Sequence, residues 1–269
     1  MAGDKQITAR WALITGASRG IGRELALGAA RAGLNVIVHS SQLSGTESLL
    51  PLLQGLGVEA VAVAADLADP QAVQAMAAEV SAKYQVDILF NNAGTNDDPT
   101  GRIFNEGDDW RASPEQYFYT YAVNVLAPAL LIEQFLPQML RNGYGRIINT
   151  TSGILYQPCA YACSKAALDK LTLDFSPRLL GTGVTMNVVD PGWIRTDLGG
   201  AEAPNDVSTV LPGMLVGAFL PDDVTGKWIA AQDFTGLTLA DAITAAPSNL
   251  RDIVATQQQY ESSEDDDSN

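Results

Sequence analysis

The chain has little histidine and little cysteine. His39 is the one histidine among 269 residues, so the side chain that usually carries protons near neutral pH is almost absent. Cys159 and Cys163 are four residues apart, and a structural disulfide framework or a zinc site needs more ligands than these two. We interpret both cysteines as small packing residues and expect no metal site.

Long apolar runs and positive charge are also scarce. No apolar stretch approaches the roughly 18 residues that span a bilayer, and we see no secretion signal. We therefore expect a cytoplasmic protein without a membrane partner. The formal net charge is −15, from 16 basic and 31 acidic residues, and this balance repels nucleic acid. The acidic end "ESSEDDDSN" predicts a disordered solubilising tail over 256–269, with an interaction tail as the alternative.

Short β-rich runs alternate with helical stretches along the first two thirds of the chain. The expected strands are apolar without strict alternation, which is typical of strands buried on both faces. They lie at 11–15, 35–40, 58–66, 86–94, 145–152, 183–192 and 226–231. Strands that alternate with helices predict an α/β fold, a doubly wound, mostly parallel sheet of about seven strands with helices on both faces. The length fits one such domain over residues 1–255.

Two expected helices have clear start signals. Asp69 precedes Pro70 at the first helical position, and Ser113 with Gln116 resembles a capping box for a helix that reaches about residue 140. Pro51, in contrast, is expected to interrupt a weaker helix around 46–57.

A glycine-rich turn, "TGASRGIG", directly follows the first expected strand. Gly16 permits the tight turn, Gly20 lets backbone amides approach a pyrophosphate, and Gly22 lets the next helix pack on the sheet. The N-terminus of that helix adds partial positive charge. The spacing differs from the familiar Gly-x-Gly-x-x-Gly, but its place between strand and helix predicts dinucleotide binding in a Rossmann fold.

The end of the second strand bears on which dinucleotide binds. Sites that prefer NAD usually carry Asp or Glu there to bind the ribose 2′-hydroxyl, and this strand ends "VHSSQ" without a carboxylate. Arg19 in the glycine turn can offer a guanidinium to a 2′-phosphate. We infer NADPH/NADP rather than NAD. The alternatives are that Arg19 is a solvated turn residue and that His39 is an ordinary strand-end side chain.

The stretch "CAYACSKAAL" places Tyr161 and Lys165 four residues apart, on one face of a helix. A free tyrosine has a pKa of about 10, and a nearby ammonium together with an oxidised nicotinamide lowers it. A tyrosine tuned in this way can give a proton to a carbonyl oxygen while hydride arrives at the carbon. Tyr-x-x-x-Lys alone is a common coincidence, so the interpretation depends on the other motifs in the chain.

Several such motifs occur along the chain. In order, they are "TGASRGIG" (15–22), "NNAG" (91–94), Asn124 in "YAVNVLAP", Ser152 in "NTTSG", "YACSK" and "PGWIRTDL" (191–198). Together they resemble the short-chain dehydrogenase/reductase (SDR) family over roughly residues 10–200. The C-terminal third is most similar to its carbonyl-reductase-like branch.

The resemblance implies roles for individual residues. Tyr161 would be the acid/base, Lys165 would lower its pKa and hold the nicotinamide ribose, and Ser152 would orient the substrate carbonyl. Asn124 would anchor a water in a proton relay to Lys165. The residues expected to contact the cofactor are Gly16, Ser18, Arg19, Gly20, Ile21, Gly22, Ser41, Asp66, Leu67, Asn92, Ala93, Gly94, Tyr161, Lys165, Pro191, Gly192, Ile194 and Thr196. The family also forms homodimers and homotetramers, through the two long helices that contain Asn124 and Tyr161.

Some features depart from the family pattern. Ser152 stands nine residues before Tyr161, where the family usually has a longer loop, so Ser152 could be displaced or Tyr156 brought into the pocket. Thr150 and Thr151 are the alternative hydroxyls. The family's glycine pair after the last strand is missing, and "GKWIAAQDFTG" stands there. The segment before Asn124 is acidic, and we interpret it as a solvated lid rather than a metal site; its acids are Asp97, Asp98, Glu106, Asp108 and Asp109.

Substrate choice is expected to depend on the C-terminal third. Residues 195–225 hold prolines and glycines, as expected of a mobile substrate lid. Trp193 either forms the floor of the nicotinamide pocket or is a buried packing residue. Because Lys and Arg do not cluster around this segment, polyanionic substrates such as carrier-bound acyl chains are disfavoured.

The sequence as a whole predicts an NADPH-dependent reductase that converts a ketone or aldehyde, a small molecule, into an alcohol. One alternative is an NAD-dependent alcohol dehydrogenase working in the oxidative direction. Another is a catalytically idle dinucleotide sensor, although a pure binder has no need of Tyr161. A sugar-nucleotide epimerase also uses Tyr and Lys, but usually in a longer chain. The sequence leaves open the substrate, the direction, the stereoselectivity and the oligomeric state.

Overall fold

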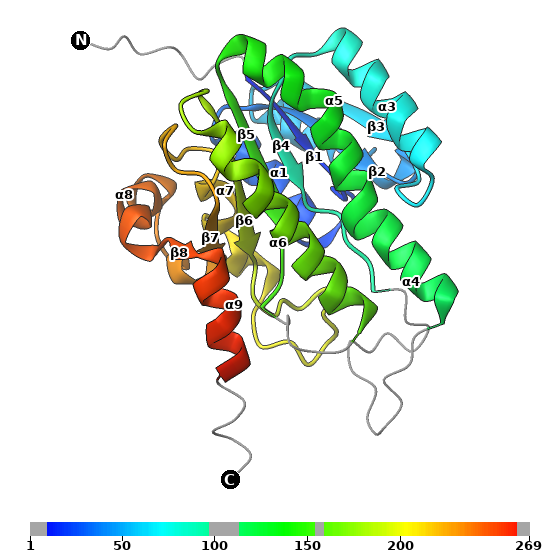
Figure 1. The fold of residues 1–269 in the computed structure, drawn as a ribbon. Coiled ribbons are helices and arrows are strands. Elements are labelled where there is room, and N and C mark those ends of the chain that lie inside the picture. The colour runs from blue at the N-terminus through cyan, green and yellow to red at the C-terminus, as the bar shows by residue number, and fades with distance from the viewer. Residues whose placement is uncertain (1–9, 97–112, 154–158, 263–269) are drawn as a thin grey trace, which may run out of the picture.

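Eight strands form one sheet in the computed structural model, which describes residues 10–96, 113–153 and 159–262 (Figure 1). In chain order they are β1 (Trp11–Ile14), β2 (Asn35–Ser40), β3 (Ala60–Ala64), β4 (Val86–Asn91), β5 (Gly145–Thr150), β6 (Val184–Asp190), β7 (Lys227–Ala230) and β8 (Arg251–Asp252). The spatial order is β3-β2-β1-β4-β5-β6-β7-β8, and every pair is parallel except β7 with β8. The predicted parallel sheet is confirmed, and the short antiparallel β8 adds a strand to the seven expected.

Helices cover both faces of this sheet. They are α1 (Gly20–Arg31), α2 (Leu50–Gly55), α3 (Pro70–Lys83), α4 (Pro114–Tyr121), α5 (Ala127–Asn142), α6 (Ala160–Leu179), α7 (Gly213–Val216), α8 (Leu239–Asn249) and α9 (Ile253–Ser262). Two buried apolar clusters follow from this layering: α1, α2, α7 and α8 contribute to one, and α3, α5 and α6 contribute to the other. In Figure 1 the helices α5 and α6 cross one face of the sheet and α1 lies on the opposite face.

The predicted helix starts are confirmed where a capping side chain was visible in the sequence. The Asp69 carboxylate accepts hydrogen bonds from the N–H groups of Gln71 (2.9 Å) and Ala72 (3.2 Å). Ser113 and Gln116 form the reciprocal capping box at the start of α4. The expectation for Pro51 is wrong, because this residue lies in the first turn of α2, where its missing N–H would have had no partner.

The helical run from Pro114 to Asn142 combines α4, a π-helical turn (Ala122–Leu126) and α5. Among the described residues it is the helix long and apolar enough, by length and composition, to cross a membrane. Half of its apolar window is nevertheless buried, because Leu131, Phe135 and Met139 pack in the cluster beneath α3. A core helix of a globular protein has the same composition.

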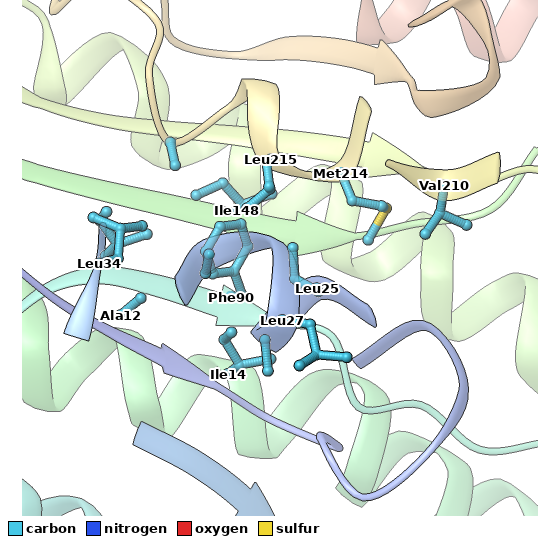
Figure 2. Close-up of a cluster of buried hydrophobic side chains, with 14 of the residues drawn as sticks. Ala12, Ile14, Leu25, Leu27, Leu34, Phe90, Ile148, Val210, Met214 and Leu215 are labelled. Atoms are coloured by element: carbon cyan, nitrogen blue, oxygen red, sulfur yellow. The ribbon is translucent and has the colours of Figure 1, made fainter. Parts of the chain in front are cut away.

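The predicted lid over 195–225 is too long. Val210 and the α7 residues Met214 and Leu215 are buried, and Figure 2 shows them in one cluster with Leu25 of α1 and Phe90 of β4. The prolines and glycines of this stretch suggested mobility, but the apolar side chains between them pack into the core. A 3₁₀ turn (Val207–Val210) leads into this buried part, so only the segment before it remains as a candidate lid.

The acidic tail predicted from residue 256 also starts too early. The helix α9 continues through Ser262, and the Gln257 amide donates a hydrogen bond to the Asp169 carboxylate at 3.2 Å. The expectations for the acidic segment 97–109, for Tyr156 and for the last residues of the tail fall outside the described residues.

Candidate active site at the carboxyl edge of the sheet

A cleft of about 990 Å³ opens at the carboxyl ends of the parallel strands. It lies where the strand order reverses, since β1 pairs with β2 on one side and with β4 on the other. In doubly wound sheets this is the position at which ligands bind. Every residue predicted to contact the cofactor lines the cleft, as do Ser152, Tyr161 and Lys165. Asn124 is the one predicted site residue that does not.

The glycine turn after β1 is packed too closely to hold side chains at two positions. Gly16 has φ +67°, and a Cβ on it would lie 2.9 Å from the Ala93 Cα. A Cβ on Gly22 would lie 2.2 Å from the Gly16 carbonyl oxygen. Arg19, the N-cap of α1, makes no side-chain capping bond, so the first N–H groups of this twelve-residue helix remain available to an anion.

Thr15 fastens this turn to the segment that follows β4. Its Oγ1 accepts hydrogen bonds from the N–H groups of Asn92 and Ala93, both at 3.0 Å. In return, the Asn92 side-chain amide donates to the Thr15 carbonyl at 2.9 Å. The two predicted motifs "TGASRGIG" and "NNAG" therefore form one rigid unit. Thr15 was not singled out from the sequence, although it opens the first motif.

The end of β2 carries no carboxylate into the cleft. His39, Ser40 and Ser41 line this part of it. The His39 ring is buried and faces the glycine turn rather than solvent, so it is not an ordinary strand-end side chain. Arg19 lies at the mouth of the cleft, where its guanidinium pairs with the Asp197 carboxylate at 3.1 Å, with both side chains largely exposed. Arg19 therefore has a partner in the protein itself.

Tyr161 and Lys165 lie at the deep end of the cleft on the first turns of α6. They are 8% and 2% exposed, and the Lys165 Nζ lies 5.6 Å from the Tyr161 ring centroid. The Lys165 ammonium donates a hydrogen bond to the Thr150 carbonyl at 2.8 Å. Ser152 is hydrogen-bonded to Tyr161. The short separation in sequence therefore does not displace Ser152 from the tyrosine.

Burial dominates the electrostatics of both groups. It raises the pKa of the Tyr161 phenol above its ordinary value, with the Ser152 hydrogen bond acting in the opposite direction. Burial also lowers the pKa of Lys165 to about 8, and the carboxyl groups of Asp169 and Asp190 oppose that effect. The sequence predicted a tyrosine pKa lowered by Lys165 together with an oxidised nicotinamide; in the protein alone, burial raises this pKa instead. The protein by itself keeps Tyr161 protonated near neutral pH.

Two buried carboxyl groups that the sequence did not single out face Lys165. Asp190, at the end of β6, accepts a hydrogen bond from the Gly192 N–H at 2.9 Å, and burial raises its pKa to about 6. Asp169, one helical turn beyond Lys165, is fully buried, and burial raises its pKa to about 7. The sequence pattern that could have identified them is an acidic residue within an otherwise apolar strand or helix.

Asn124 lies behind the cleft wall in the π-helical turn. Its Nδ2 donates to the Thr95 carbonyl and to the Ser164 hydroxyl, both at 2.9 Å, and its Oδ1 accepts from the Thr95 N–H at 2.9 Å. A Cβ on Gly94 would lie 3.6 Å from this Oδ1 and 3.3 Å from the Lys165 Nζ, so Gly94 lies beside both groups. Because both amide hydrogens are used, a relay water could bond only to the oxygen or to the backbone of Asn124.

Trp193 and Tyr119 also line the cleft. The Trp193 side chain is half exposed, and its Nε1 donates to the Gly199 carbonyl at 2.7 Å. The interpretation of Trp193 as a buried packing residue is therefore wrong. No three His, Cys, Asp or Glu side chains of the described ranges gather as a metal site would require.

Known proteins share this sequence pattern and this architecture. The sequence model of the short chain dehydrogenase family matches residues 10–206. A short-chain type dehydrogenase/reductase of Picea abies is 34% identical over 251 residues, which cover 83% of this chain and 89% of that protein. The 3-oxoacyl-(acyl-carrier-protein) reductase FabG of Staphylococcus aureus is 34% identical over 193 residues, or 70% of this chain and 75% of FabG. A solved blue fluorescent protein from a metagenomic library, in complex with NADPH, superimposes with a TM-score of 0.70 and 30% identity, covering 82% of this chain and 95% of that one.

Proposed function

The chain belongs to the short-chain dehydrogenase family, and on that basis we propose that it reduces a ketone or aldehyde to an alcohol with NADPH, as in the carbonyl-reductase-like branch. The observation that carries this proposal is the pairing of a buried, protonated Tyr161 with Ser152 and Lys165 at the deep end of the cleft. A glycine turn at a helix N-terminus lies in the same cleft.

The cleft residues fit a phosphorylated dinucleotide. Because Gly16 and Gly22 have no side chains, a diphosphate can approach the backbone of the turn closely. The N-terminus of α1, which has no side-chain cap, offers N–H donors to it. Arg19 and Ser41 line the same cleft, and we infer that this guanidinium and this hydroxyl bind the 2′-phosphate. NADPH, when bound, supplies the hydride that reaches the carbonyl carbon.

The chain's own residues supply the proton. The Tyr161 phenol donates it to the carbonyl oxygen, because burial keeps the phenol protonated near neutral pH. The Ser152 hydroxyl, next to the phenol, can donate a hydrogen bond to the same oxygen and stabilise its developing charge. Lys165, with a pKa of about 8, is mostly an ammonium at neutral pH and can attract the negative charge left on the phenol.

The test is an NADPH-consumption assay with a diverse panel of ketones and aldehydes. We expect turnover with at least one carbonyl compound. Faster oxidation of alcohols with NAD than any NADPH-dependent reduction would replace the proposal with an NAD-dependent alcohol dehydrogenase. Tight binding of dinucleotides without turnover in either panel would identify a sensor instead.

We expect Arg19→Ala to weaken NADPH binding far more than NADH binding. The guanidinium can bond the 2′-phosphate, and a charge-assisted hydrogen bond is worth about 1.5–3 kcal/mol, or roughly one to two orders of magnitude in Kd. Fluorescence titration with both coenzymes measures the difference. Arg23→Ala is the matched control, since Arg23 lies on α1 beside Glu24 and does not line the cleft. An equal loss for both coenzymes would contradict the prediction.

We also propose that the protein is a homodimer or homotetramer that associates through the face of α4 and the π-helical turn. Phe118 is 77% exposed there, and Leu126 is also exposed.

We expect Phe118→Glu to shift the mass measured by light scattering toward the monomer, because a buried charge at an apolar contact is costly. Leu52→Glu, on the exposed side of α2, should leave the mass unchanged. A wild-type monomer, or an unchanged Phe118→Glu assembly, would refute the proposal.

A further inference from the structure

His39 contacts the glycine turn through both its backbone and its ring. The ring is 2% exposed, with Nε2 at 3.1 Å from the Ala65 carbonyl oxygen. The Gly16 N–H donates to the ring's Nδ1 at 3.4 Å, and the Ala17 N–H donates to the His39 carbonyl at 2.8 Å. Two consecutive N–H groups of the turn therefore donate hydrogen bonds to one residue of β2.

These contacts determine which ring nitrogen carries the proton. A carbonyl oxygen can only accept, so Nε2 must be the nitrogen that carries hydrogen and donates to Ala65. Nδ1 is then left with its lone pair, and it can accept the hydrogen bond from Gly16. A second proton on the ring would occupy Nδ1, so this nitrogen could no longer accept a hydrogen bond. The Gly16 N–H and the Nδ1–H would then be two donors that face each other.

Gly16 has little freedom to adapt to such a change. Its φ of +67° and the close approach of its Cα hydrogens to Ala93 fix the turn on the opposite side. The Gly16 carbonyl oxygen is also in contact with Gly22 at the start of α1. A displaced Gly16 would therefore disturb the N-terminus of α1, which is the part of the cleft suited to an anion.

We infer that His39 is a positioning residue for the coenzyme, whose neutral ring holds the glycine turn in its binding conformation and whose protonation releases the turn. This inference rests on the proposed function, because it assigns the turn to coenzyme phosphates. The ring contacts Gly16 and Ala65 rather than Tyr161 or Lys165, so we expect its effect on coenzyme affinity rather than on the chemical step.

No neighbouring charge is placed to compensate a proton on the ring. Among the described segments packed against β2, the glycine turn carries Arg19, the segment after β3 carries Asp66, and α1 carries Arg23, Glu24 and Arg31. The causes that shift the pKa of His39 are burial and the Ala65 carbonyl rather than these charges. Arg19 pairs with Asp197, and the Asp66 carboxylate accepts from the Ala68 N–H at 2.9 Å. Burial lowers the pKa of His39, with the Ala65 carbonyl acting in the opposite direction.

The sign of the pH effect follows from that direction. The pKa of His39 in the folded protein lies below the ordinary value of 6.5, so the neutral ring is the form that folding favours. Its contribution to stability is fully present above pH 6.5 and is lost as the pH falls through the lower, folded-state value. Coenzyme affinity should decrease over the same acid range.

The test is a fluorescence titration with NADH across pH, from about 8 down to about 5. NADH is the better probe here, because the 2′-phosphate of NADPH itself takes up a proton with a pKa of about 6. We expect the wild-type Kd to rise toward acid pH, by about tenfold for each pH unit below the folded-state pKa of His39, because the protonated ring does not hold the turn. His39→Asn should bind with a nearly constant Kd, since its side-chain oxygen can accept from Gly16 but does not titrate. His39→Gln serves the same purpose if the Asn variant does not fold.

A second measurement separates the inference from the proposed function. Thermal unfolding without coenzyme should show a larger loss of Tm toward acid pH in the wild type than in His39→Asn. If NADH and NADPH fail to bind at pH 8 while this difference in Tm appears, the proposed function falls and the contact with the turn stands. If the acid loss of Kd and of Tm is the same in the wild type and in His39→Asn, the inference about His39 is wrong.

Discussion

Tyr161→Phe is expected to lower the rate of carbonyl reduction by about 10²–10⁴-fold, the usual contribution of a positioned general acid. The substitution removes the phenolic oxygen at the deep end of the cleft and keeps the ring that fills this buried space. Coenzyme binding should be nearly unchanged, because the glycine turn and Lys165 remain in place. Single-turnover measurements with saturating NADPH would report the loss as a change in the chemical step.

Tyr84→Phe is the matched control for this experiment. Tyr84 lies at the end of α3, where its ring packs against Trp11 with centroids 4.6 Å apart, and it does not line the cleft. Its variant should keep wild-type turnover. If Tyr161→Phe also kept full turnover, Tyr161 would not be the proton donor, and Ser152 would become the candidate.

Gly22→Ala is expected to abolish measurable coenzyme binding and to lower the free energy of unfolding by about 1–3 kcal/mol, as overpacking does in well-packed interiors. The added Cβ would lie 2.2 Å from the Gly16 carbonyl oxygen and 2.6 Å from the Asn92 Nδ2. Both neighbours belong to the unit that Thr15 holds together, so neither can move without opening the turn. Denaturant unfolding and NADPH titration measure the two effects.

Gly55→Ala provides the comparison, since it makes the same chemical change in another helix. Gly55 ends α2, and a Cβ there would have nothing within 4 Å. This variant should be neutral or more stable by about 0.4–1 kcal/mol, because alanine restricts the unfolded chain. Similar losses in both variants would show that the contact at Gly22 is not the cause.

The sequence was sufficient to predict the fold and the lining of the cleft, and the reason is physical. Strand ends of a parallel sheet meet at one edge, so motifs that follow strands must lie close together. Gly16, Asn92, Ser152 and Pro191 each follow a different strand, and all of them line one cleft. The helix starts at Asp69 and Ser113 were equally predictable, because capping is a local interaction.

Other features depended on packing that no local pattern reveals. The sequence showed an ammonium near Tyr161 but not how deeply the phenol is buried, so it did not predict that burial raises the pKa of Tyr161 in the protein alone. The inward orientation of His39 and the approach of Asp169 to Lys165 depend on contacts between distant segments. The strand β8 has two residues, too few for any periodicity, and the buried part of the predicted lid was obscured by its prolines and glycines.

The hydrogen bond between Gln257 and Asp169 sets a practical limit on shortening this protein. The family model matches residues 10–206, so a shortened chain could be designed to end just after the last parallel strand, β7. Such a truncation would remove the Gln257 amide, whose hydrogen bond lowers the pKa of the buried Asp169 carboxyl. Without this donor the Asp169 carboxyl would take up a proton more readily, and a neutral Asp169 would no longer raise the pKa of Lys165 against the effect of burial. The smallest piece with an intact interior therefore extends through α9.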